Sequence, residues 1–434
     1  MKKVLSAFAI ASLAACGSSS DPTPGGSNSV AGVSEARSSL ARDTNPNVSE
    51  ADFKAFMAGR SALSASLHKS LSASPQFAGK NFFFSPYSID TALAMAYAGA
   101  AGDTKREMAA ALQLNLADDK LHAAYNKLAL ELESRGKNAT AQDGQPFRLR
   151  VNNSTWAQRD TKFETVFLNT LAKNYGAGVN VVDFKNATDE ARVAINGWVA
   201  KKTEDKIKDM LAPGTLNPLT RLVLVNTVYF NAGWMTKFKP ADTKPAPFNA
   251  PTGPVTVDMM SNVVTAGFTT GQGYKAVELN YDGSEVSMVV VVPDGDIAAF
   301  EAKLDGAKLD AITSSFGTKM VTLKMPKFKI EGATFSVKDA LKGLGMNKAF
   351  TPGAADFTAI TKDEPLFVSD VAHKSFVNVD ENGTEAAAAT AVIFVTTSVP
   401  ESVELTVDKP FWFGIRDRKT GALVFTGRVV NPKG

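Results

Sequence analysis

Residues 380–398 combine two opposite structural preferences, and this combination restricts the folds that the chain can adopt. The four alanines at 386–389 favour a helix, whereas the mainly β-branched residues 392–397 favour a strand. Gly383 precedes both and can take backbone angles that other residues resist. A single helix or strand does not account for this stretch, which points to a segment that changes its conformation.

Read as a strand, this segment has one face without any charge. With a period of two, that face carries Thr384, Ala386, Ala388, Thr390, Val392, Phe394 and Thr396. The only charge between Thr384 and Thr397 is Glu385, which falls on the opposite face. Such a segment can lie exposed as a loop and later enter a sheet, where bulky or charged inward residues would obstruct it. On composition alone, a helix or an ordinary core strand is the commoner interpretation.

The whole chain has the composition of an ordinary globular protein. Its 434 residues allow two domains or one large one, but from about residue 49 we find no second linker and no internal repeat. The net charge of +3 comes from 47 basic and 44 acidic residues without a basic cluster, so we expect no nucleic-acid partner. Helices come first and strands dominate later without regular alternation, which predicts a single α+β domain at residues 49–434.

The N-terminus has the pattern of an export signal. Lys2 and Lys3 precede an apolar run at 4–13 that is too short to span a bilayer. The run ends in Leu13-Ala14-Ala15-Cys16, which resembles the lipobox of bacterial lipoproteins. The resemblance implies that residues 1–16 hold a lipoprotein signal peptide and that Cys16 carries acyl chains as a membrane anchor. Cys16 is the only cysteine, so no disulfide forms within one chain.

Residues 17–48 are rich in Ser, Gly, Pro, Asn and Thr. We expect them to form a flexible tether that holds the folded domain off the membrane. Gly17 stands where an Asp is associated with retention in the inner membrane. The predicted location is therefore the bacterial cell envelope, at the outer membrane, with the domain on the cell surface or in the periplasm.

Local patterns predict the elements of the domain. Ser85-Pro86 reads as an N-cap followed by proline in the first helical turn, and residues 220–230 read as a central strand. The predicted helices cover residues 49–71, 86–99, 104–112, 117–135, 188–210, 297–315 and 336–344. The predicted strands cover residues 82–84, 149–158, 179–184, 220–230, 255–260, 274–279, 286–292, 321–328, 366–380, 403–407, 411–417 and 422–430.

Several motifs in this domain resemble those of one known family. They are Asn81-Phe-Phe-Phe-Ser85-Pro86-Tyr-Ser88-Ile89, Asn226-Thr-Val-Tyr-Phe230-Asn-Ala-Gly-Trp234, Leu344-Gly-Met346 with Ala355-Asp356-Phe357, and Phe425-Thr-Gly-Arg428. In this order they resemble the signatures of the serpins, the serine protease inhibitors, and the likeness extends over residues 49–434. It implies the serpin fold, an α+β fold with three β-sheets, about nine helices and an exposed reactive-centre loop.

The segment at 380–398 resembles the serpin hinge and the loop that follows it. The residues that match the hinge of inhibitory serpins are Glu381, Gly383, Thr384, Glu385, Ala386, Ala387, Ala388, Ala389 and Thr390. In that family the residue equivalent to Gly383 is the fifteenth before the cleaved bond. This spacing predicts a reactive bond between Thr397 and Ser398, to within about one residue.

The resemblance implies suicide inhibition of a serine endopeptidase, so the chain is predicted to be an inhibitor and not an enzyme. The protease would form an acyl-enzyme and be trapped when the cleaved loop inserts into sheet A. Small residues around Thr397 suit elastase-like or subtilisin-like proteases, and no Lys or Arg lies between Thr384 and Asp408. The expected partners are the target serine protease, in a covalent complex, and the membrane; we expect a monomer.

Five further residues match structural positions of the family. Ser85, Ser88, Asn226 and His373 match the shutter, a buried hydrogen-bond cluster beneath the place where sheet A opens, and Trp234 matches the breach, where the loop first enters. On residue type alone, His373 and Trp234 also read as ordinary core side chains.

We expect no cofactor. Three histidines without a cysteine in the domain argue against a zinc site. The predicted helix at 117–135 carries a mixed-charge face, which argues against a heparin-type polyanion cofactor.

Two alternative functions follow from the sequence. The first is a non-inhibitory serpin that acts as a binding or structural protein. The second is a serine β-lactamase-like enzyme, since Ser66-x-x-Lys69, Tyr229-x-Asn231 and Lys419-Thr-Gly421 imitate the motif set of penicillin-recognising enzymes. Ser-x-x-Lys also occurs at 134–137, however, and residues 417–421 read better as a hairpin turn.

Overall fold

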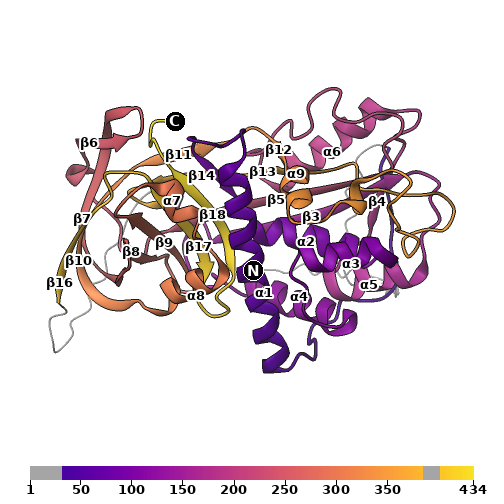
Figure 1. The fold of residues 1–434 in the computed structure, drawn as a ribbon, viewed down its shortest axis with the longest axis horizontal. Helices are drawn as coiled ribbons and strands as arrows, with labels where there is room; N and C mark the ends of the chain where they lie inside the picture. Colours follow the sequence, from indigo (N-terminus) through magenta and orange to yellow (C-terminus); the bar gives the residue numbers. More distant parts are fainter. Residues whose placement is uncertain (1–31, 385–400) are drawn as a thin grey trace, which may run out of the picture.

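Two nine-stranded sheets and nine α-helices form the part of the chain that we describe, residues 32–384 and 401–434 of a computed structural model (Figure 1). Helices dominate the first half and strands the second, and the predicted α+β class is confirmed. The predictions for Cys16 and for residues 385–390, 397 and 398 lie outside the described residues.

Two of the helices begin at serine residues whose side chains cap the first turn. Ser49 accepts a hydrogen bond from the N–H of Asp52, and Ser85 accepts one from the N–H of Ser88, with Pro86 in the first turn. The helices are α1 (Glu50–Ala73), α2 (Pro86–Tyr97), α3 (Gly102–Ala111), α4 (Asp118–Glu133), α5 (Thr165–Tyr175), α6 (Thr188–Lys202), α7 (Ile297–Glu301), α8 (Gly306–Ser314) and α9 (Lys338–Gly343).

Three predicted helices differ from the structure. The helix predicted to begin at Thr104 begins at Gly102, and the buried hydroxyl of Thr104 accepts the N–H of Asp356. The helix predicted at 188–210 ends at Lys202, where Thr203 accepts the N–H of Ile207. The helix predicted at 297–315 is divided, because Asp305 caps a new helix through the N–H of Lys308. Helix α5 was not predicted from the sequence.

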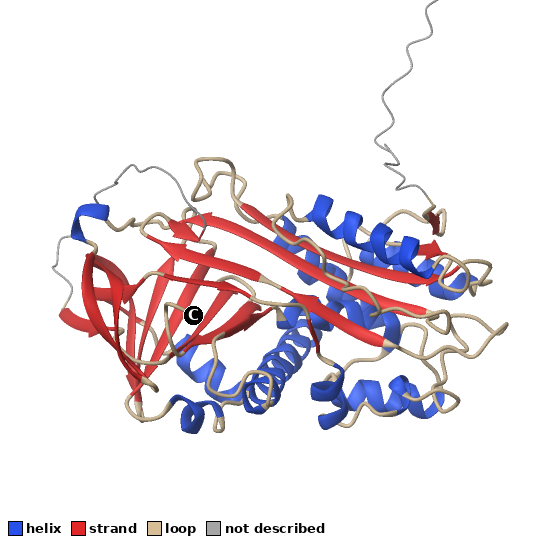
Figure 2. Ribbon diagram, turned by 90° about the horizontal axis from the view of Figure 1, so that it is seen from above, coloured by secondary structure: helices blue, strands red, loops and turns tan. Residues whose placement is uncertain are grey.

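The first sheet is built on two long strands in its centre. Its strands are β1 (Ser34–Ala36), β3 (Arg148–Gln158), β4 (Val179–Val182), β5 (Leu222–Gly233), β11 (Phe328–Glu331), β12 (Phe335–Ser336), β13 (Asp370–Lys374), β14 (Phe376–Asp380) and β15 (Gly383–Thr384). The order is β1-β4-β3-β5-β15-β14-β11, and β13 pairs with β5 and β12. Figure 2 shows the long strands along the molecule.

The strand predicted at 366–380 is interrupted. It consists of β13 and β14, which separate at Ser375. This residue is buried, and its hydroxyl donates to the carbonyl of Phe83, so it is held toward the second sheet. The break allows the two halves to pair with different strands.

The second sheet bends around one very long strand. Its strands are β2 (Phe82–Phe84), β6 (Lys244–Ala250), β7 (Gly253–Gly271), β8 (Tyr274–Asn280), β9 (Val286–Pro293), β10 (Gly317–Pro326), β16 (Ser402–Thr406), β17 (Phe411–Asp417) and β18 (Leu423–Val429). The order is β16-β10-β7-β8-β9-β17-β18-β2, with β6 on β7. Because β7 contributes to both halves, the two further sheets that the family fold implies share one continuous ladder here.

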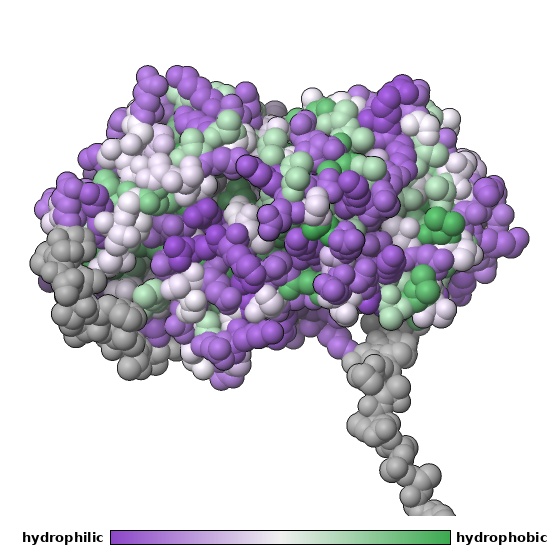
Figure 3. Space-filling model, turned by 90° about the horizontal axis from the view of Figure 1, so that it is seen from below, coloured by the Kyte–Doolittle hydropathy of each residue, from purple (hydrophilic) through white to green (hydrophobic). Residues whose placement is uncertain are grey.

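The core lies between the sheets and under the helices. α2 packs against β3, β5 and β18, so it contacts both sheets. On the other face of the first sheet, Ile195 and Val199 of α6 pack with Trp156 and Val225. None of the helices in residues 32–384 and 401–434 combines the length and apolar character needed to cross a bilayer. On the face that Figure 3 shows, apolar side chains lie in small groups between hydrophilic ones.

The predicted tether extends too far toward the C-terminus. Residues 34–36 form β1, which pairs antiparallel with β4, and thereby cover the outer edge of that strand. Arg42 donates to the side chain of Asn126 and forms an ion pair with Glu133 at 2.8 Å, and the side chain of Asn126 donates to the carbonyl of Asp43. Residues 34–48 therefore belong to the folded body. Their polar composition gave no sign of these long-range partners.

We predict that removing this segment lowers the stability of the folded body. Relative to a soluble form that lacks residues 1–16, a form that lacks residues 1–48 should melt at least about 5 °C lower, because hydrogen bonds to charged groups are lost. A form that lacks residues 1–31 is the matched control and should melt unchanged. Equal melting temperatures for all three forms, measured by circular dichroism, would contradict the docking of residues 34–48.

Candidate functional site

One edge of β5 has two different partner strands and a space between them. Its lower part pairs in parallel with β13, from Val223 to Thr227. Its upper end pairs antiparallel with β15 at Ala232 and Gly233. Residues 228–231 of β5 lie between these two ladders and belong to neither.

Strand β14 leaves the same space on its other side. It pairs with β15 only at Val379 and Asp380, and with β11 along its opposite edge. Residues 376–378 therefore face residues 228–231 of β5 across a place that no described strand fills. We call these two stretches the sheet opening.

The two residues of β15 stand at the upper end of the sheet opening. Thr384 pairs with Ala232 on β5 and with Val379 on β14. Because β15 runs antiparallel to β5, the chain at Thr384 is directed toward residue 231 and into the opening. Glu381, Gly383 and Thr384 are thus the part of the predicted hinge that the structure describes.

Gly383 can be replaced by no other residue without strain. Its φ of 149° lies in a region that side chains disfavour. A Cβ atom added there would lie 2.2 Å from the carbonyl oxygen of Ala232 and 2.7 Å from the Cα of Gly233. Both are backbone atoms of β5, so they cannot move aside as a side chain would.

Thr384 points inward and contacts Tyr281. Its side chain is buried, and its hydroxyl lies 2.8 Å from the hydroxyl of Tyr281. The ring of Tyr281 stacks on Trp234 with centroids 4.6 Å apart and an angle of 8° between the planes. Burial raises the pKa of Tyr281, so the phenol keeps its proton.

Trp234 fastens the turn between β14 and β15 to β5. Its indole N–H donates to the carbonyl of Asp380 at 2.9 Å, and its backbone N–H donates to the carbonyl of Asn382 at 2.8 Å. The carboxylate of Asp380 accepts hydrogen bonds from the side chain of Gln142 and from the N–H of Asn382. Burial raises the pKa of Asp380.

Glu381 is held by a second set of contacts. It forms an ion pair with Lys327 at 3.0 Å and accepts the hydroxyl of Thr243 at 2.8 Å. Burial works against its charge, but hydrogen bonds and the Lys327 ammonium prevail and lower the pKa of Glu381. These contacts fix the position at which the hinge begins.

A buried hydrogen-bond cluster lies directly below the opening. His373 and Asn226 are register partners across β13 and β5, and Nδ1 of the imidazole is hydrogen-bonded to Oδ1 of Asn226. Nε2 accepts the backbone N–H of Ser85 at 3.1 Å, which assigns the ring proton to Nδ1. Burial lowers the pKa of His373 to about 3, so the ring is neutral at physiological pH.

The serines extend this cluster to α2 and β3. The hydroxyl of Ser85 donates to the carbonyl of Val424, and the hydroxyl of Ser88 donates to the side chain of Asn153. The structure thus places Ser85, Asn226 and His373 in direct contact and links Ser88 to them through Ser85. These contacts join β5 and β13 where an incoming strand would separate them.

The Lys419-Thr-Gly421 motif, which belongs to the β-lactamase-like alternative, has another role in the structure. Lys419 forms an ion pair with Glu131 at 2.9 Å. Residues 417–421 form the turn between β17 and β18, with Gly421 at a φ of 78°. Within the described ranges, no three His, Cys, Asp or Glu side chains gather as metal ligands would.

Sequence reasoning missed four side chains at the opening. Gln142, Thr243, Tyr281 and Lys327 contact the hinge from four separate segments of the chain. No local pattern marks them, because each becomes a neighbour of the hinge only through the pairing of distant strands.

Comparisons with family models, with known sequences and with solved structures all find members of one family. The family model described as "Serpin (serine protease inhibitor)" matches residues 58–432. The chain is 36% identical to an uncharacterized serpin-like protein of Thermococcus kodakarensis, over 96% of this chain and 95% of the relative. It is 36% identical to the leukocyte elastase inhibitor of Xenopus tropicalis, over 81% of this chain and 93% of that protein.

A solved structure extends this likeness to the fold. The crystal structure of tengpin, a thermophilic serpin in the native state, superposes with a TM-score of 0.77 at 26% identity, over 90% of this chain and 96% of that chain.

We predict that acid loosens the β5–β13 junction. The pKa of His373 is about 3 when the sheet is closed and about 6.5 in an unfolded chain, so the unfolded chain binds the extra proton between these values. The contribution of His373 to the free energy of unfolding is therefore complete above pH 6.5 and decreases as the pH falls. At pH 5 this residue alone lowers the free energy of unfolding by about 2 kcal/mol.

The unfolding rate in urea, measured from pH 8 to pH 5, tests this prediction. His373→Gln should unfold faster than the parent at pH 8. Its unfolding rate should increase less than that of the parent between pH 8 and pH 5. Some dependence should persist, because burial lowers the pKa of His68 and of His122 as well. An unchanged slope in the variant would contradict the role of His373.

Proposed function

The chain belongs to the serpin family, and on this premise we propose that it is a suicide inhibitor of serine endopeptidases. The observation that carries the proposal is the position of β15 at the upper end of the sheet opening. The hinge is already in register with β5 and β14, and β15 fits between these two strands at the upper end of the opening. A segment with an uncharged, mostly small inward face follows it.

The chemistry belongs to the protease, and the inhibitor supplies the strand. The protease serine would attack the carbonyl carbon of Thr397, and the amine of Ser398 would leave with a proton. The product is an ester between the protease serine and Thr397. Cleavage frees the loop from its C-terminal attachment, so that residues 385–397 can follow β15 into the sheet.

The register of β15 defines the inserted strand. With Thr384 opposite Ala232, each further residue of the loop advances one residue back along β5, so position 385 comes opposite 231 and position 394 opposite 222. Beyond residue 228 the new strand must displace β13 from β5. The His373–Asn226 hydrogen bond is then broken, and the protease is drawn toward the lower end of the sheet.

The free energy available is comparable with the stability of a protease domain. A strand of this length makes on the order of ten backbone hydrogen bonds at about 1 kcal/mol each. A protease domain is stable by roughly 5–15 kcal/mol, so insertion can distort its active site. The uncleaved form is correspondingly metastable and is maintained by a kinetic barrier.

The loop sequence sets the proposed specificity. Thr396, Thr397 and Ser398 are small, which suits the shallow pockets of elastase-like and subtilisin-like proteases. One of the relatives is named an inhibitor of leukocyte elastase, which supports this class of target for the present chain. Trypsin-like proteases are not proposed, because the loop offers them no Lys or Arg.

We further propose that lipid on Cys16 anchors the protein in a bacterial envelope. The described chain begins beside β1, whose partner β4 lies next to the end of β3 that pairs with residues 222–224 of β5, whereas the hinge pairs with Ala232 and Gly233 at the other end of β5. Figure 1 shows β4 and β16 at opposite ends of the molecule. The anchor and the reactive loop would therefore lie at opposite ends. The intact loop would face away from the membrane, whereas the trapped protease would arrive on the membrane side.

We predict covalent trapping that depends on the inward face of Thr384. The soluble form lacking residues 1–16, mixed with elastase and subtilisin, should give a denaturant-resistant band of summed mass and release a fragment that starts at Ser398. Thr384→Arg should be cleaved at the same bond but yield at least about tenfold less complex, since the buried site at Tyr281 cannot hold a charge. Thr384→Ser, which keeps the hydroxyl, is the matched control.

Two outcomes would count against the proposal. Normal complex formation by Thr384→Arg would contradict insertion at this register. Cleavage of the parent across a panel of proteases without any complex, and without a gain in heat stability, would favour a non-inhibitory serpin.

We also predict that the anchored inhibitor needs the length of residues 17–31. Fully extended, these residues reach at most about 50 Å, which is just more than the diameter of about 45 Å of a protease domain of roughly 220 residues. Deletion of residues 20–29 should therefore reduce complex formation by lipidated protein in vesicles. The same deletion in the soluble form should have no effect; equal complex yields from both vesicle samples would contradict the membrane-side arrival of the protease.

A further inference from the structure

Strand β3 is paired along only part of its outer edge. Its inner edge pairs with β5 from Arg148 to Ala157. On the outer edge β4 pairs with residues 155–158 only. Residues 148–154 thus have no strand on that side within the described part of the chain. In an antiparallel pair, every second residue directs its N–H and C=O away from its partner, so a row of backbone groups is presented here.

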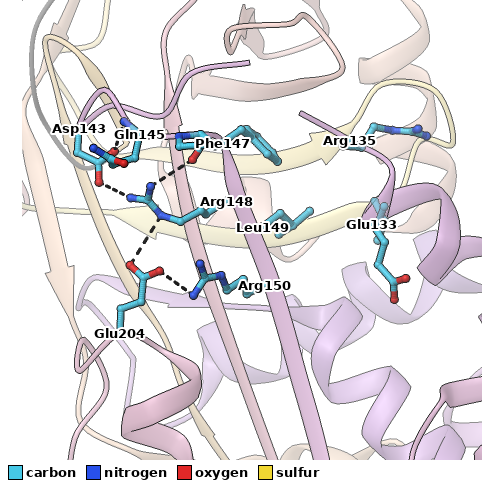
Figure 4. A pocket seen from close by; sticks show the side chains of 11 residues that line it. Glu133, Arg135, Asp143, Gln145, Phe147, Arg148, Leu149, Arg150 and Glu204 are labelled. Atoms are coloured by element: carbon cyan, nitrogen blue, oxygen red, sulfur yellow. Dashed lines mark hydrogen bonds and ion pairs between the residues drawn. The ribbon is translucent and has the colours of Figure 1, made fainter. Parts of the chain in front are cut away.

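Two cavities follow this free edge. The first has a volume of about 490 Å³ and lies where β3 begins, beside the C-terminal end of α4. Figure 4 shows Arg148 and Arg150 on one side of the strand with Glu204, and Leu149 and Phe147 on the side toward α4. The second cavity, of about 130 Å³, also touches Leu149 and continues past Val151 and Asn153.

The side chains along the edge alternate in character. Leu149 and Val151 point toward α4 and are only half-buried, although they are apolar. Arg148 and Arg150 alternate with them on the opposite face of the strand. An added strand would therefore meet an apolar groove with every second side chain and guanidinium groups with the others.

The arginines offer places for carboxylates. The side chain of Arg148 is nine-tenths buried, yet its Nε has no hydrogen-bond partner, and the nearest carboxylate oxygen, on Glu204, is 3.7 Å away. Arg150 is half exposed and pairs with Glu204 at 2.6 Å. Glu204 itself has a φ of 51°, which a non-glycine residue adopts at a cost. A carboxylate from a ligand can take over these contacts.

We propose that this edge binds an extended peptide as an additional strand. The peptide has apolar residues at alternate positions, directed at Leu149 and Val151, and carboxylates between them, directed at Arg148 and Arg150. Residues 148–154 provide room for about seven residues, a usual strand length. Main-chain hydrogen bonds supply affinity and the alternate side chains supply specificity.

A small anion fits these observations less well. Asp143 and Glu204 already pair with Arg148 and Arg150, so a free ion would have to displace them by charge alone, whereas a peptide carboxylate is also held by the backbone of its strand. An ion would also leave the backbone edge and the apolar side of the cavity without a partner. The inference does not depend on inhibitory activity, because the edge lies on the opposite side of β5 from the sheet opening.

The test uses a labelled heptapeptide, Leu-Glu-Val-Glu-Val-Glu-Leu with blocked ends, and the soluble form lacking residues 1–16. Fluorescence anisotropy should show binding that Arg150→Glu weakens at least about tenfold through like-charge repulsion. Lys162→Glu, a charge reversal at a distant exposed residue, is the matched control and should bind as the parent does. A peptide of the same composition with its three glutamates grouped should bind weakly.

Two measurements separate strand pairing from other modes of binding. Methylation of alternate peptide nitrogens, which removes donors but keeps every side-chain charge, should abolish binding. Hydrogen exchange should slow at residues 148–154 when the peptide is bound. The proposal is overturned by full binding of the methylated peptide, by equal competition from inorganic phosphate, or by protection confined to residues 228–231 at the sheet opening.

Discussion

The parallel pairing of β13 with β5 holds the first sheet closed below residue 228, and the state of the whole molecule depends on it. The ladder is short, five residue pairs, but it is reinforced by the buried contact between His373 and Asn226 and by the N–H of Ser85. Above it the sheet is already open, with two residues of the hinge in place. A strand that enters from the β15 end of β5 can cross this barrier without unfolding of the core, because it replaces each β5–β13 residue pair that it breaks.

The hinge is arranged so that only one chain path leads into the sheet. Gly383 lies against backbone atoms of β5, the buried hydroxyl of Thr384 contacts that of Tyr281, whose ring stacks on Trp234, and Glu381 forms an ion pair with Lys327. Contacts to Asp380 and Asn382 hold the preceding turn. Register is therefore established ahead of the proposed insertion, and a slip of one residue would turn Thr384 away from Tyr281 and bring Glu385 to the buried face.

Much of the fold could be predicted from local signals, and the limits of that prediction are physical. Ser49 and Ser85-Pro86 mark helix starts because capping is a short-range interaction. Gly383 and Thr384 were predicted as hinge residues because they match the hinge motif of the family and precede a segment with one uncharged face. In contrast, the docking of residues 34–48, the break at Ser375 and the contact between Tyr281 and Thr384 depend on partners more than eighty residues away in sequence. Periodicity and composition carry no information about such partners.

The central claim is that the sheet opening accepts the cleaved loop as a strand, and hydrogen exchange before and after cleavage tests it most directly. In the intact soluble protein, amides of residues 228–231 and 376–378 that face the opening should exchange faster than those bonded within the β3–β5 and β11–β14 ladders. After a protease has cut the loop, the account predicts strong protection of the amides that face the opening and a new protected segment after Thr384. Exchange that stays fast in the cleaved protein at both stretches would contradict it.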